Sequence, residues 1–328
     1  MNKFKRLVSL FLSLIILGVF FVGCNGQNSN EADAPRVALI LEGPISDMAW
    51  NAAAYKGLTE IEKLGAEIGY EENVSVNMVS DVIETYVSKG YNIIYLATNG
   101  YYDSINSVIS NYPNVQFVLM NGDETKNNLY STQIAEEEQG FMMGVIAATA
   151  TKTKKVGFVG GPDILPIVKA KKGFVEGVKY VDDSVEVFSK NLDCFKNINQ
   201  AREFSKQFIK TGVDVLVPVC DQSAIGVIEA AEEANIMSVC SGAEQEAMAV
   251  RSGLIAVEKD SSIGYVSSYK KILDGTLEDK VTKIGVEDGA IYLSNWFAAS
   301  DSMSEEEKQN VEDIYNKLKN GEISINLD

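Results

Sequence analysis

The chain has 328 residues and a mass of 35.8 kDa, enough for about two domains of ordinary size. Hydrophobic residues make up 46% of it and charged residues 23%, so it can bury a full core and is not disordered overall. Its net charge of −17 argues against a nucleic-acid partner, because binding to phosphates draws on clustered cations. The chain has no histidine, which excludes His-based catalytic triads, His-containing zinc sites and an imidazole general base.

The N-terminal segment is typical of an export signal. Residues 1–6 carry three basic side chains, and an apolar run without a charge follows over residues 7–22. This run is shorter than the roughly 20 residues that a membrane-spanning helix needs. We therefore expect the globular part of the chain to lie outside the cytoplasm.

A lipid anchor is expected where the apolar run ends. Residues 21–24 (FVGC) resemble the bacterial lipobox, in which a signal peptidase cuts before a lipid-bearing cysteine, although Phe21 stands where Leu is usual. This resemblance implies a signal peptide over residues 1–23 and a lipidated Cys24 at the extracytoplasmic face of the cell membrane. An uncleaved single anchor is the alternative.

A flexible tether is expected next, over residues 24–34, because the segment after Cys24 consists of small and polar residues without apolar periodicity. Without residues 1–23, which carry three cations and no acidic residue, the net charge falls to −20. No basic patch remains to suggest nucleic acid as a partner.

From residue 36 onward, short apolar runs alternate with segments of helical periodicity. Strands are expected at residues 36–41, 74–79, 92–97, 116–121, 155–160, 185–190, 214–219 and 235–240. Helices are expected over residues 48–64, 135–150, 198–210 and 221–234. Continuous apolar strands separated by helices indicate βαβ units, hence parallel sheets covered on both faces. The predicted fold class is doubly wound α/β.

The strands form two similar halves, four before residue 131 and four after residue 154. Two later runs, 254–259 and 281–287, are most simply explained if the chain returns to the first lobe and then crosses back. Ligands of doubly wound sheets sit outside the carboxyl ends of the strands, so two facing lobes predict a ligand site in a shared interlobe cleft. The expected lobes are residues 35–131 plus 258–286 for the first, and 132–257 plus 287–328 for the second.

Motifs of catalysis are missing from the sequence. There is no GxxxxGK[ST] phosphate loop, no GxSxG elbow and no GxGxxG after a strand. The acidic runs Asp182-Asp183 and Glu136-Glu137-Glu138 are expected to be solvated surface. We predict no catalytic residue, no cofactor and no metal site; an extracellular enzyme with a cysteine nucleophile activated by Asp or Lys is an alternative.

Three cysteines, Cys194, Cys220 and Cys240, fall at or near the carboxyl ends of strands in the second half. Free buried cysteine usually behaves as a small hydrophobic residue. A disulfide, which would leave one thiol over, or a three-thiolate metal site are the alternatives.

Aromatic side chains follow several of the strands. Trp50 follows the first, Tyr101 and Tyr102 the third, and Phe195 a strand of the second half. Aromatics gathered at the mouth of a cleft predict a pocket that stacks on both faces of a flat ring. Four polar residues are candidates to bond the edge of that ring: Asp47, Asn51, Asn99 and Asn121.

Over residues 36–295 the chain resembles the basic membrane protein family of ABC-transporter substrate-binding lipoproteins, whose best-understood members bind purine nucleosides. The matching pieces are Gly43, Asp47, Met48, Ala49, Trp50, Asn51 and Gly57; KVGFVGG at 155–161 with Pro166, Gly173, Phe174 and Gly177; residues 212–215; Ile225-Gly226-Val227-Ile228 with Ala230-Ala231; and residues 114–120 and 141–148.

The resemblance implies a two-lobed periplasmic-binding-protein type I fold that closes on its ligand by hinge bending, without a catalytic step. It also implies an ABC permease and ATPase as partners. By position, Trp50 and Phe195 would sandwich the base, while Asp47 and Asn51 would read its edge. Asp221 and Cys240 would line the far wall of the pocket.

This chain departs from the family where the family binds ribose. Residues 238–240 read Ser-Val-Cys where the family has Gly-Val-Asp, Glu258 stands where it has a Lys after a Val, and Asn121 replaces a further Asp. A thiol cannot replace a carboxylate that accepts bonds from hydroxyls without loss, because a buried unpaired hydroxyl costs about 1–3 kcal/mol.

We therefore predict a purine nucleoside or a related flat heterocycle as the ligand. A free nucleobase, flavin or thiamine, or a surface receptor that feeds a sensor rather than a permease, are the alternatives. The residues expected to bind the ligand are Asp47, Trp50, Asn51, Asn99, Tyr101, Asn121, Phe195, Asp221, Cys240 and Glu258.

Overall fold

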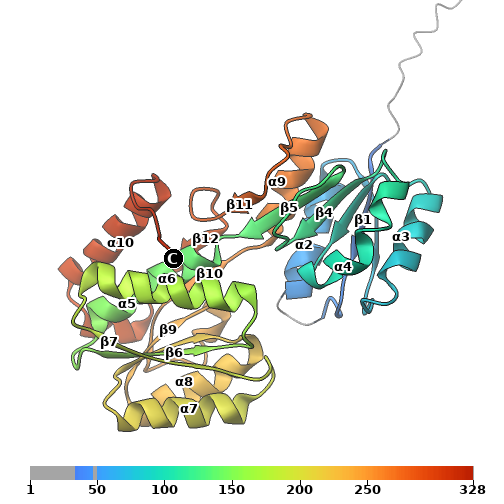
Figure 1. Cartoon of the computed structure of the whole chain (residues 1–328). Helices are drawn as coiled ribbons and strands as arrows, with labels where there is room; N and C mark the ends of the chain where they lie inside the picture. Colours follow the sequence, from blue (N-terminus) through green and yellow to red (C-terminus); the bar gives the residue numbers. More distant parts are fainter. Residues whose placement is uncertain (1–33, 47–49, 328) are drawn as a thin grey trace, which may run out of the picture. The chain divides into compact units, whose positions relative to one another are not determined.

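The computed structural model describes residues 34–46 and 50–327. The predicted signal peptide, Cys24 and Asp47 therefore lie outside the described residues. The chain from Pro35 onward forms one unit, Pro35–Asp328, and this unit contains two six-stranded sheets, each with its own helices (Figure 1). No helix in the described part of the chain is long and apolar enough to cross a membrane.

The first sheet, with its helices, forms the first lobe. Its strands are β1 (Arg36–Ile40), β2 (Glu67–Glu71), β3 (Ile93–Leu96), β4 (Gln116–Met120), β5 (Leu129–Ile134) and β11 (Thr282–Ile284), in the order β11-β5-β4-β3-β1-β2. All neighbours are parallel. One face packs on α2 (Trp50–Lys63) and α9 (Ser262–Leu273), and the other on α3 (Val79–Ser88), α4 (Tyr102–Ile105) and the short helices η1 (Asn99–Tyr101) and η2 (Ile109–Asn111).

The second sheet, with its helices, forms the second lobe. Its strands are β6 (Lys155–Gly160), β7 (Glu186–Asn191), β8 (Val215–Val219), β9 (Met237–Cys240), β10 (Gly253–Lys259) and β12 (Ile291–Leu293), in the order β12-β10-β9-β8-β6-β7. Only the β10–β12 pair is antiparallel among these strands. One face packs on α5 (Glu136–Ala150), α6 (Leu165–Val181) and α10 (Glu305–Lys319), and the other on α7 (Ile198–Lys210) and α8 (Ala224–Ala234). Short helices η3 (Asp221–Ser223), η4 (Ala243–Gln245) and η5 (Ala298–Ser302) complete this lobe.

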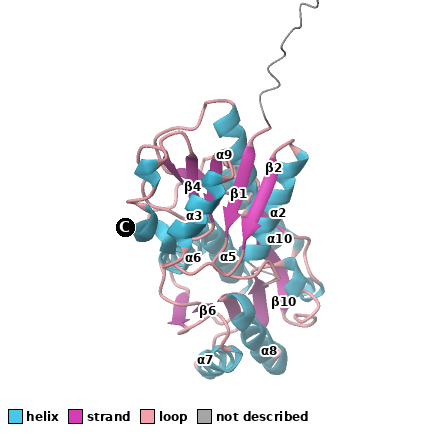
Figure 2. Cartoon of the chain, turned by 90° about the vertical axis from the view of Figure 1, so that its right-hand side faces the viewer, coloured by secondary structure: helices cyan, strands magenta, loops and turns pink. Residues whose placement is uncertain are grey.

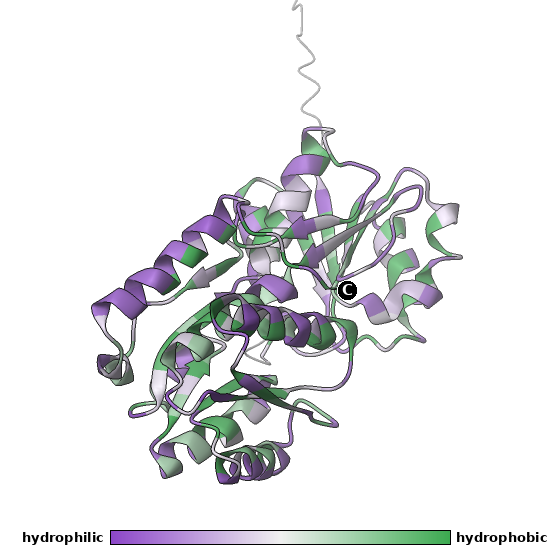
Figure 3. Ribbon diagram, turned by 60° about the vertical axis from the view of Figure 1, so that its left-hand side comes forward, coloured by the Kyte–Doolittle hydropathy of each residue, from purple (hydrophilic) through white to green (hydrophobic). Residues whose placement is uncertain are grey.

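The central strands are buried on both faces, which explains their uninterrupted apolar sequences. All five residues of β8 (VLVPV) are buried, as are four of the five in β1 (RVALI). Strands and helices alternate in both lobes (Figure 2), and hydrophobic residues gather on the strands that the helices cover (Figure 3). Burial on both faces by helices is what a parallel sheet requires, and the predicted two-lobed, doubly wound α/β fold is confirmed.

Helices α5 and α6 are in unusually close contact through glycines. A side chain at any of four positions would put its Cβ within 2.2 Å of a backbone oxygen of the facing helix: Gly140, Gly144, Gly173 and Gly177. Helix α5 is itself buried on nearly all sides. Backbone cannot move aside as a flexible side chain can, so α5 and α6 behave as one rigid platform.

The chain passes between the lobes three times: from β5 to α5 at residues 134–136, from β10 to α9 at 259–262, and from β11 to β12 at 284–291. Strand β5 ends three residues beyond the lobe boundary expected at residue 131. The other two passages fall within a few residues of the expected ends at 258 and 286.

One predicted strand is wrong and three strands were missed. Residues 74–78 form a loop that leads into α3, which begins at Val79; in this loop Val74 is buried, but Val76 and Met78 are 45% and 53% exposed. The strand in this region is β2, which is an edge strand and is too polar to be recognised as an apolar run. Strands β5 and β12 were missed because β5 is rich in polar residues and β12 has three residues.

Candidate ligand-binding site

Both sheets have the same strand order around their first strand, which fixes where a ligand site is expected. In each, the second strand lies on one side of the first strand and the third strand on the other: β2-β1-β3 in the first lobe and β7-β6-β8 in the second. Doubly wound sheets bind ligands outside the carboxyl ends of the strands at such a switch point. The two places of interest are therefore the ends of β1 and β3, and those of β6 and β8.

Trp50 lies at the switch point of the first lobe. It is the first residue of α2, and its indole Nε1 donates a hydrogen bond of 2.5 Å to the carbonyl of Ala97, the residue that follows β3. The ring is half-buried against core residues. The hydrogen bond fixes one edge of the indole, so the ring cannot turn freely about its χ angles.

Phe195 lies at the corresponding place in the second lobe. It follows β7, and its ring packs against Gly161, directly after β6: a Cβ at Gly161 would lie 2.2 Å from Phe195 Cε1. The carbonyl of Phe195 accepts a 3.1 Å hydrogen bond from the amide of Ser223, which follows β8. Gly161 was not singled out from the sequence for this role.

Two polar residues at strand ends have left-handed backbones. Asn121, after β4, has φ of 56°, and Asp221, two residues after β8, has φ of 46°. Such conformations are uncommon outside glycine and gather at functional sites. The backbone amide of Asn121 donates a 2.7 Å hydrogen bond to the carbonyl of Thr132. Its side-chain Oδ1 accepts a 3.2 Å hydrogen bond from the backbone amide of Ile134. Asp221 is exposed at the start of η3.

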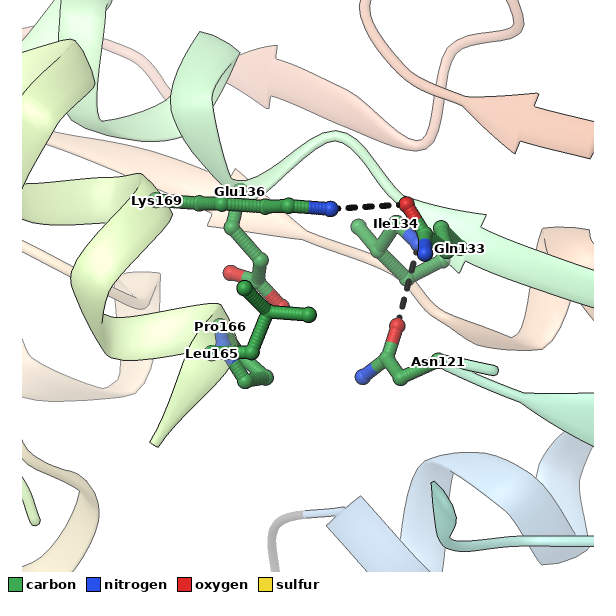
Figure 4. A pocket seen from close by; sticks show the side chains of 7 residues that line it. All are labelled: Asn121, Gln133, Ile134, Glu136, Leu165, Pro166 and Lys169. Carbon is green, nitrogen blue, oxygen red and sulfur yellow. Dashed lines mark hydrogen bonds between the residues drawn. The ribbon is translucent and has the colours of Figure 1, made fainter. Parts of the chain in front are cut away.

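Asn121 contributes to a small pocket that residues of both lobes line (Figure 4). Its lining residues are Asn121, Gln133, Ile134, Glu136, Leu165, Pro166 and Lys169. Lys169 Nζ donates 2.8 Å to Gln133 Oε1, and Gln133 Nε2 donates to the carbonyl of Gly122 and to Asp123 Oδ1. The cavity has a volume of about 10 Å³, so it holds about one water or one ligand oxygen.

Comparison with known proteins identifies the family. Residues 34–328 match the sequence model of the family described as ABC transporter substrate-binding protein PnrA-like. The chain belongs to the PnrA-like family. Members of this family are extracytoplasmic substrate-binding proteins, which implies a small-molecule ligand and permease partners, and the predicted family is confirmed.

Relatives with two kinds of name match almost the whole chain. Basic membrane protein D of Borreliella burgdorferi (strain JD1) is 27% identical over 95% of this chain and 92% of its own length. Transcriptional activator protein med of Bacillus subtilis (strain 168) is 25% identical over 98% of this chain and 99% of its own length.

Solved structures agree on the fold. A transcriptional activator of the comK gene from Bacillus halodurans superposes with a TM-score of 0.75 at 24% identity, over 87% of this chain and 97% of that one. An ABC transporter solute-binding protein from Conexibacter woesei DSM 14684 gives 0.72 at 20% identity, over 89% and 99%. The fold of this PnrA-like protein is therefore the periplasmic-binding-protein fold.

The other residues expected in the first-lobe site have different surroundings. Asn51 is 7% exposed, and its Oδ1 accepts a 3.4 Å hydrogen bond from the amide of Gly43. Asn99 is exposed at the start of η1. Tyr101 is completely buried, and its hydroxyl donates 2.7 Å to the carbonyl of Val74, so it lies in the core and we leave it out of the site proposed below. Burial also raises the pKa of Tyr101.

The second-lobe residues expected on the far wall are also tied into the protein. Cys240 is completely buried in a cluster with Ile228 and Phe297, and burial raises the pKa of its thiol to about 12. It is a core residue. Glu258 is half-buried, and its Oε1 accepts 2.6 Å from the amide of Ala243. Burial raises the pKa of this carboxyl, and Glu244 adds to the rise.

The three cysteines are not joined by a disulfide. Cys194 is exposed, whereas Cys220 and Cys240 are buried, and all three are free. Burial, with a contribution from Asp221, raises the pKa of the Cys220 thiol, which packs in the core as a small hydrophobic residue. Within residues 34–46 and 50–327, no group of three Cys, Asp or Glu side chains is placed to hold a metal ion.

The expectation that Glu136, Glu137 and Glu138 are solvated is wrong. Glu136 and Glu137 are only 3% and 6% exposed, and Glu138 is half-buried. Glu136 forms an ion pair with Lys259, whose Nζ lies 3.0 Å from both carboxylate oxygens. Burial alone would lower the pKa of Lys259, but the charge of Glu136, the hydrogen bond to Glu136 and the charge of Asp221 together outweigh burial, so the pKa is raised. The partner is more than a hundred residues away in the chain, so no local signal pointed to it.

Proposed function

We propose that this protein is a lipid-anchored substrate-binding protein of an ABC importer that binds a purine nucleoside or a related flat heterocycle between Trp50 and Phe195. The ligand would lie in the interlobe cleft and close it by hinge bending, with no catalytic step and no cofactor. The observation that carries the proposal is that the two aromatic side chains occupy matching switch points, one in each lobe. Stacking contributes about 0.5–1.5 kcal/mol for each ring beyond the area that it buries.

The hydrogen bonds of Asn121 suggest which chemical group the ligand would present on the edge that faces this residue. Its Oδ1 is held by the amide of Ile134, so turning the side-chain amide over would place two donors against each other. The Nδ2 group is turned toward Pro166 (Figure 4). Asn121 would thus offer a donor, and it selects a ligand with a carbonyl oxygen or a ring nitrogen at that edge. The exposed carboxylate of Asp221 would accept from a ligand N–H or hydroxyl.

Ribose recognition is the part of the family pattern that this chain changes. Cys240 is in the core, and Glu258 is already bonded to the amide of Ala243. Neither arrangement supplies the free carboxylate that two vicinal hydroxyls would favour. A free nucleobase or another flat heterocycle is therefore the alternative ligand within the same proposal.

A second candidate function is that of a surface receptor that reports ligand occupancy to a regulator. The observation that favours it is that a relative in Bacillus subtilis (strain 168) and a solved structure from Bacillus halodurans are both named as transcriptional activators. Both functions use the same lobes and the same pocket. Co-purification of the full chain with a permease and an ATPase would favour the importer.

The proposed ligand class is tested by a thermal-shift screen of residues 27–328 against nucleosides, nucleobases, flavins, thiamine and sugars. A ligand that binds only the native state stabilises it by RT ln(1 + [L]/Kd), about 2.7 kcal/mol at a hundredfold excess over Kd. Stabilisation by guanosine or inosine is the expected result. A response to free bases alone would restrict the proposal to the nucleobase alternative, and a response only to sugars would overturn the ligand class. Mass spectrometry of the mature N-terminus tests the lipid on Cys24.

A further inference from the structure

The first passage between the lobes leads directly into α5, and residues at or beside the other two passages contact the first turn of this helix. Three consecutive carboxylates start this helix, where the helix dipole favours negative charge. Successive helical residues point about 100° apart, so adjacent side chains can reach different neighbours. Glu136 pairs with Lys259 at the second passage, Glu137 with Lys283 beside the third, and Glu138 accepts 2.6 Å from the amide of Val286 within the third.

These contacts differ in what they join. Glu136 and Lys259 both belong to the second lobe, one on α5 and the other at the end of β10. Glu137 also belongs to the second lobe, but Lys283 is the middle residue of β11, an edge strand of the first sheet. The 2.9 Å contact between Glu137 Oε1 and Lys283 Nζ therefore joins the two lobes.

The Glu137 side of this pair is fixed. A Cβ at Gly173 of α6 would lie 2.0 Å from the backbone carbonyl oxygen of Glu137, so the first turn of α5 is in close contact with α6. Movement of the first lobe relative to the second must then move Lys283 against a stationary carboxylate. The Lys283 side chain is 56% exposed and long enough to follow only part of such a movement.

Separating the pair is costly because Glu137 is buried. Its side chain is 8% exposed, and its Oε2 is buried without a hydrogen-bond partner within residues 34–46 and 50–327. A buried carboxylate that loses its cation is destabilised much more than an exposed one. The arrangement of the lobes that keeps the pair together is therefore favoured over arrangements that separate it.

We propose that Glu137 and Lys283 are positioning residues of the hinge, whose lobe-spanning ion pair sets how strongly the protein favours one arrangement of its lobes. Neither residue is expected to touch the ligand. They act on binding through the population of the competent arrangement, because the apparent Kd equals the intrinsic Kd divided by that population. This role rests on the proposed function in one respect, which is that the movement of the lobes is taken to be their closure on the ligand.

The test measures lobe arrangement without ligand, so its failure is distinguishable from failure of the purine proposal. Nitroxide labels are placed on Glu62→Cys in α2 and Glu203→Cys in α7, both exposed, in the full chain kept in detergent. Cys24 and Cys194 are first changed to Ser, while the two buried thiols stay. Electron–electron double resonance gives the distribution of distances between the labels.

Lys283→Met and Glu137→Gln are each expected to broaden the distance distribution, with the ratio of lobe arrangements changing about threefold to tenfold. Lys283→Arg keeps the charge and is expected to restore the parent distribution. Lys280→Met is the matched control, because Lys280 lies on the same segment and pairs with Glu278 at the exposed surface.

Two results would overturn the proposal. One is a distribution that stays as narrow as the parent's in both charge-removing variants while their circular dichroism shows an intact fold. The other is equal broadening by Lys280→Met. A purely structural role predicts a lower melting temperature with an unchanged distribution, so the melting temperature of every variant is measured beside it.

Discussion

The two switch points carry an aromatic ring in the same place but hold it in different ways. In the first lobe, Trp50 is the first residue of a helix and is fixed by a side-chain hydrogen bond to the carbonyl of Ala97, the residue that follows β3. In the second, Phe195 lies on a loop, and what positions its ring is the missing side chain of Gly161. The Trp50 ring is positioned by a hydrogen bond, whereas the Phe195 ring is positioned by the space that remains because Gly161 has no side chain.

This difference means that the two sites respond to different substitutions. Removing a ring should weaken binding on either side, because each ring would lose one stacking face and its buried area. The Phe195 ring should in addition be sensitive to a small side chain added at Gly161, directly after β6. The predictions below test this asymmetry, beginning with the largest effect.

Trp50→Ala is expected to weaken ligand binding about 100-fold, because it removes both the stacking surface and the apolar area of the largest aromatic side chain. Calorimetric titration with the ligand found in the thermal-shift screen measures the effect. Trp296→Phe is the control, because Trp296 bonds to Glu312 and is not part of the site. Parent-like affinity in Trp50→Ala would contradict the stacking role.

Phe195→Ala is expected to weaken binding about 10-fold to 30-fold, less than Trp50→Ala because the ring is smaller. The same titration measures it. Phe195→Tyr is the conservative comparison and should bind within a few-fold of the parent protein. If Phe195→Ala had no effect while Trp50→Ala abolished binding, the ligand would stack on one lobe only.

Gly161→Ala is expected to weaken binding about threefold to tenfold, because the new Cβ would lie 2.2 Å from the Phe195 ring and must displace it. Gly100→Ala is the comparison in the first lobe. Gly100 follows β3, and a Cβ there meets nothing closer than 3.4 Å. Equal effects of the two substitutions on binding would remove the asymmetry between the switch points.

Glu138→Gln is expected to have the smallest effect, a pH-dependent gain in stability below about 1 kcal/mol. Burial raises the pKa of Glu138, and the charges of Glu137 and Asp288 add to the rise, while the Val286 amide and Lys283 oppose it. A raised pKa in the folded state means that this carboxyl favours folding below its unfolded pKa, near 4.5, and loses that contribution as the pH rises through the folded value.

The stabilities of parent and Glu138→Gln should therefore converge at acidic pH and separate above pH 4.5, with the variant the more stable. Urea unfolding from pH 4 to pH 8 measures the difference. Glu306→Gln, at an exposed position of α10, should show no such separation. If the parent protein became more stable than Glu138→Gln as the pH rises, the predicted direction of the stability difference would be contradicted.

The sequence predicted the buried parts of the fold well and its edges poorly. Strands β1, β6 and β8 are covered on both faces, so their apolar runs stand out. Strand β2 is an exposed edge strand, and its sequence EIGYE carries no such run. The nearby run at residues 74–79 is apolar, yet two of its large side chains face solvent.

The candidate site was predictable only where a residue's position along the chain determines its surroundings. Trp50 and Phe195 follow strands at switch points, which strand order alone locates. Tyr101 also follows a strand but turns into the core, because the residues of a short helix point in all directions. The burial of Glu137 depends on Lys283, 146 residues away, and no local pattern predicts such a pair.

The most direct test of the central claim uses the tryptophans themselves. The chain has two, so Trp296→Phe leaves Trp50 as the single reporter. Titration of this variant with purine nucleosides and nucleobases should quench or shift its fluorescence saturably, because a flat ring stacks on the indole. Phe195→Ala in the same background should move the midpoint to higher ligand concentration. Saturable binding by calorimetry without any change in Trp50 fluorescence would contradict the account.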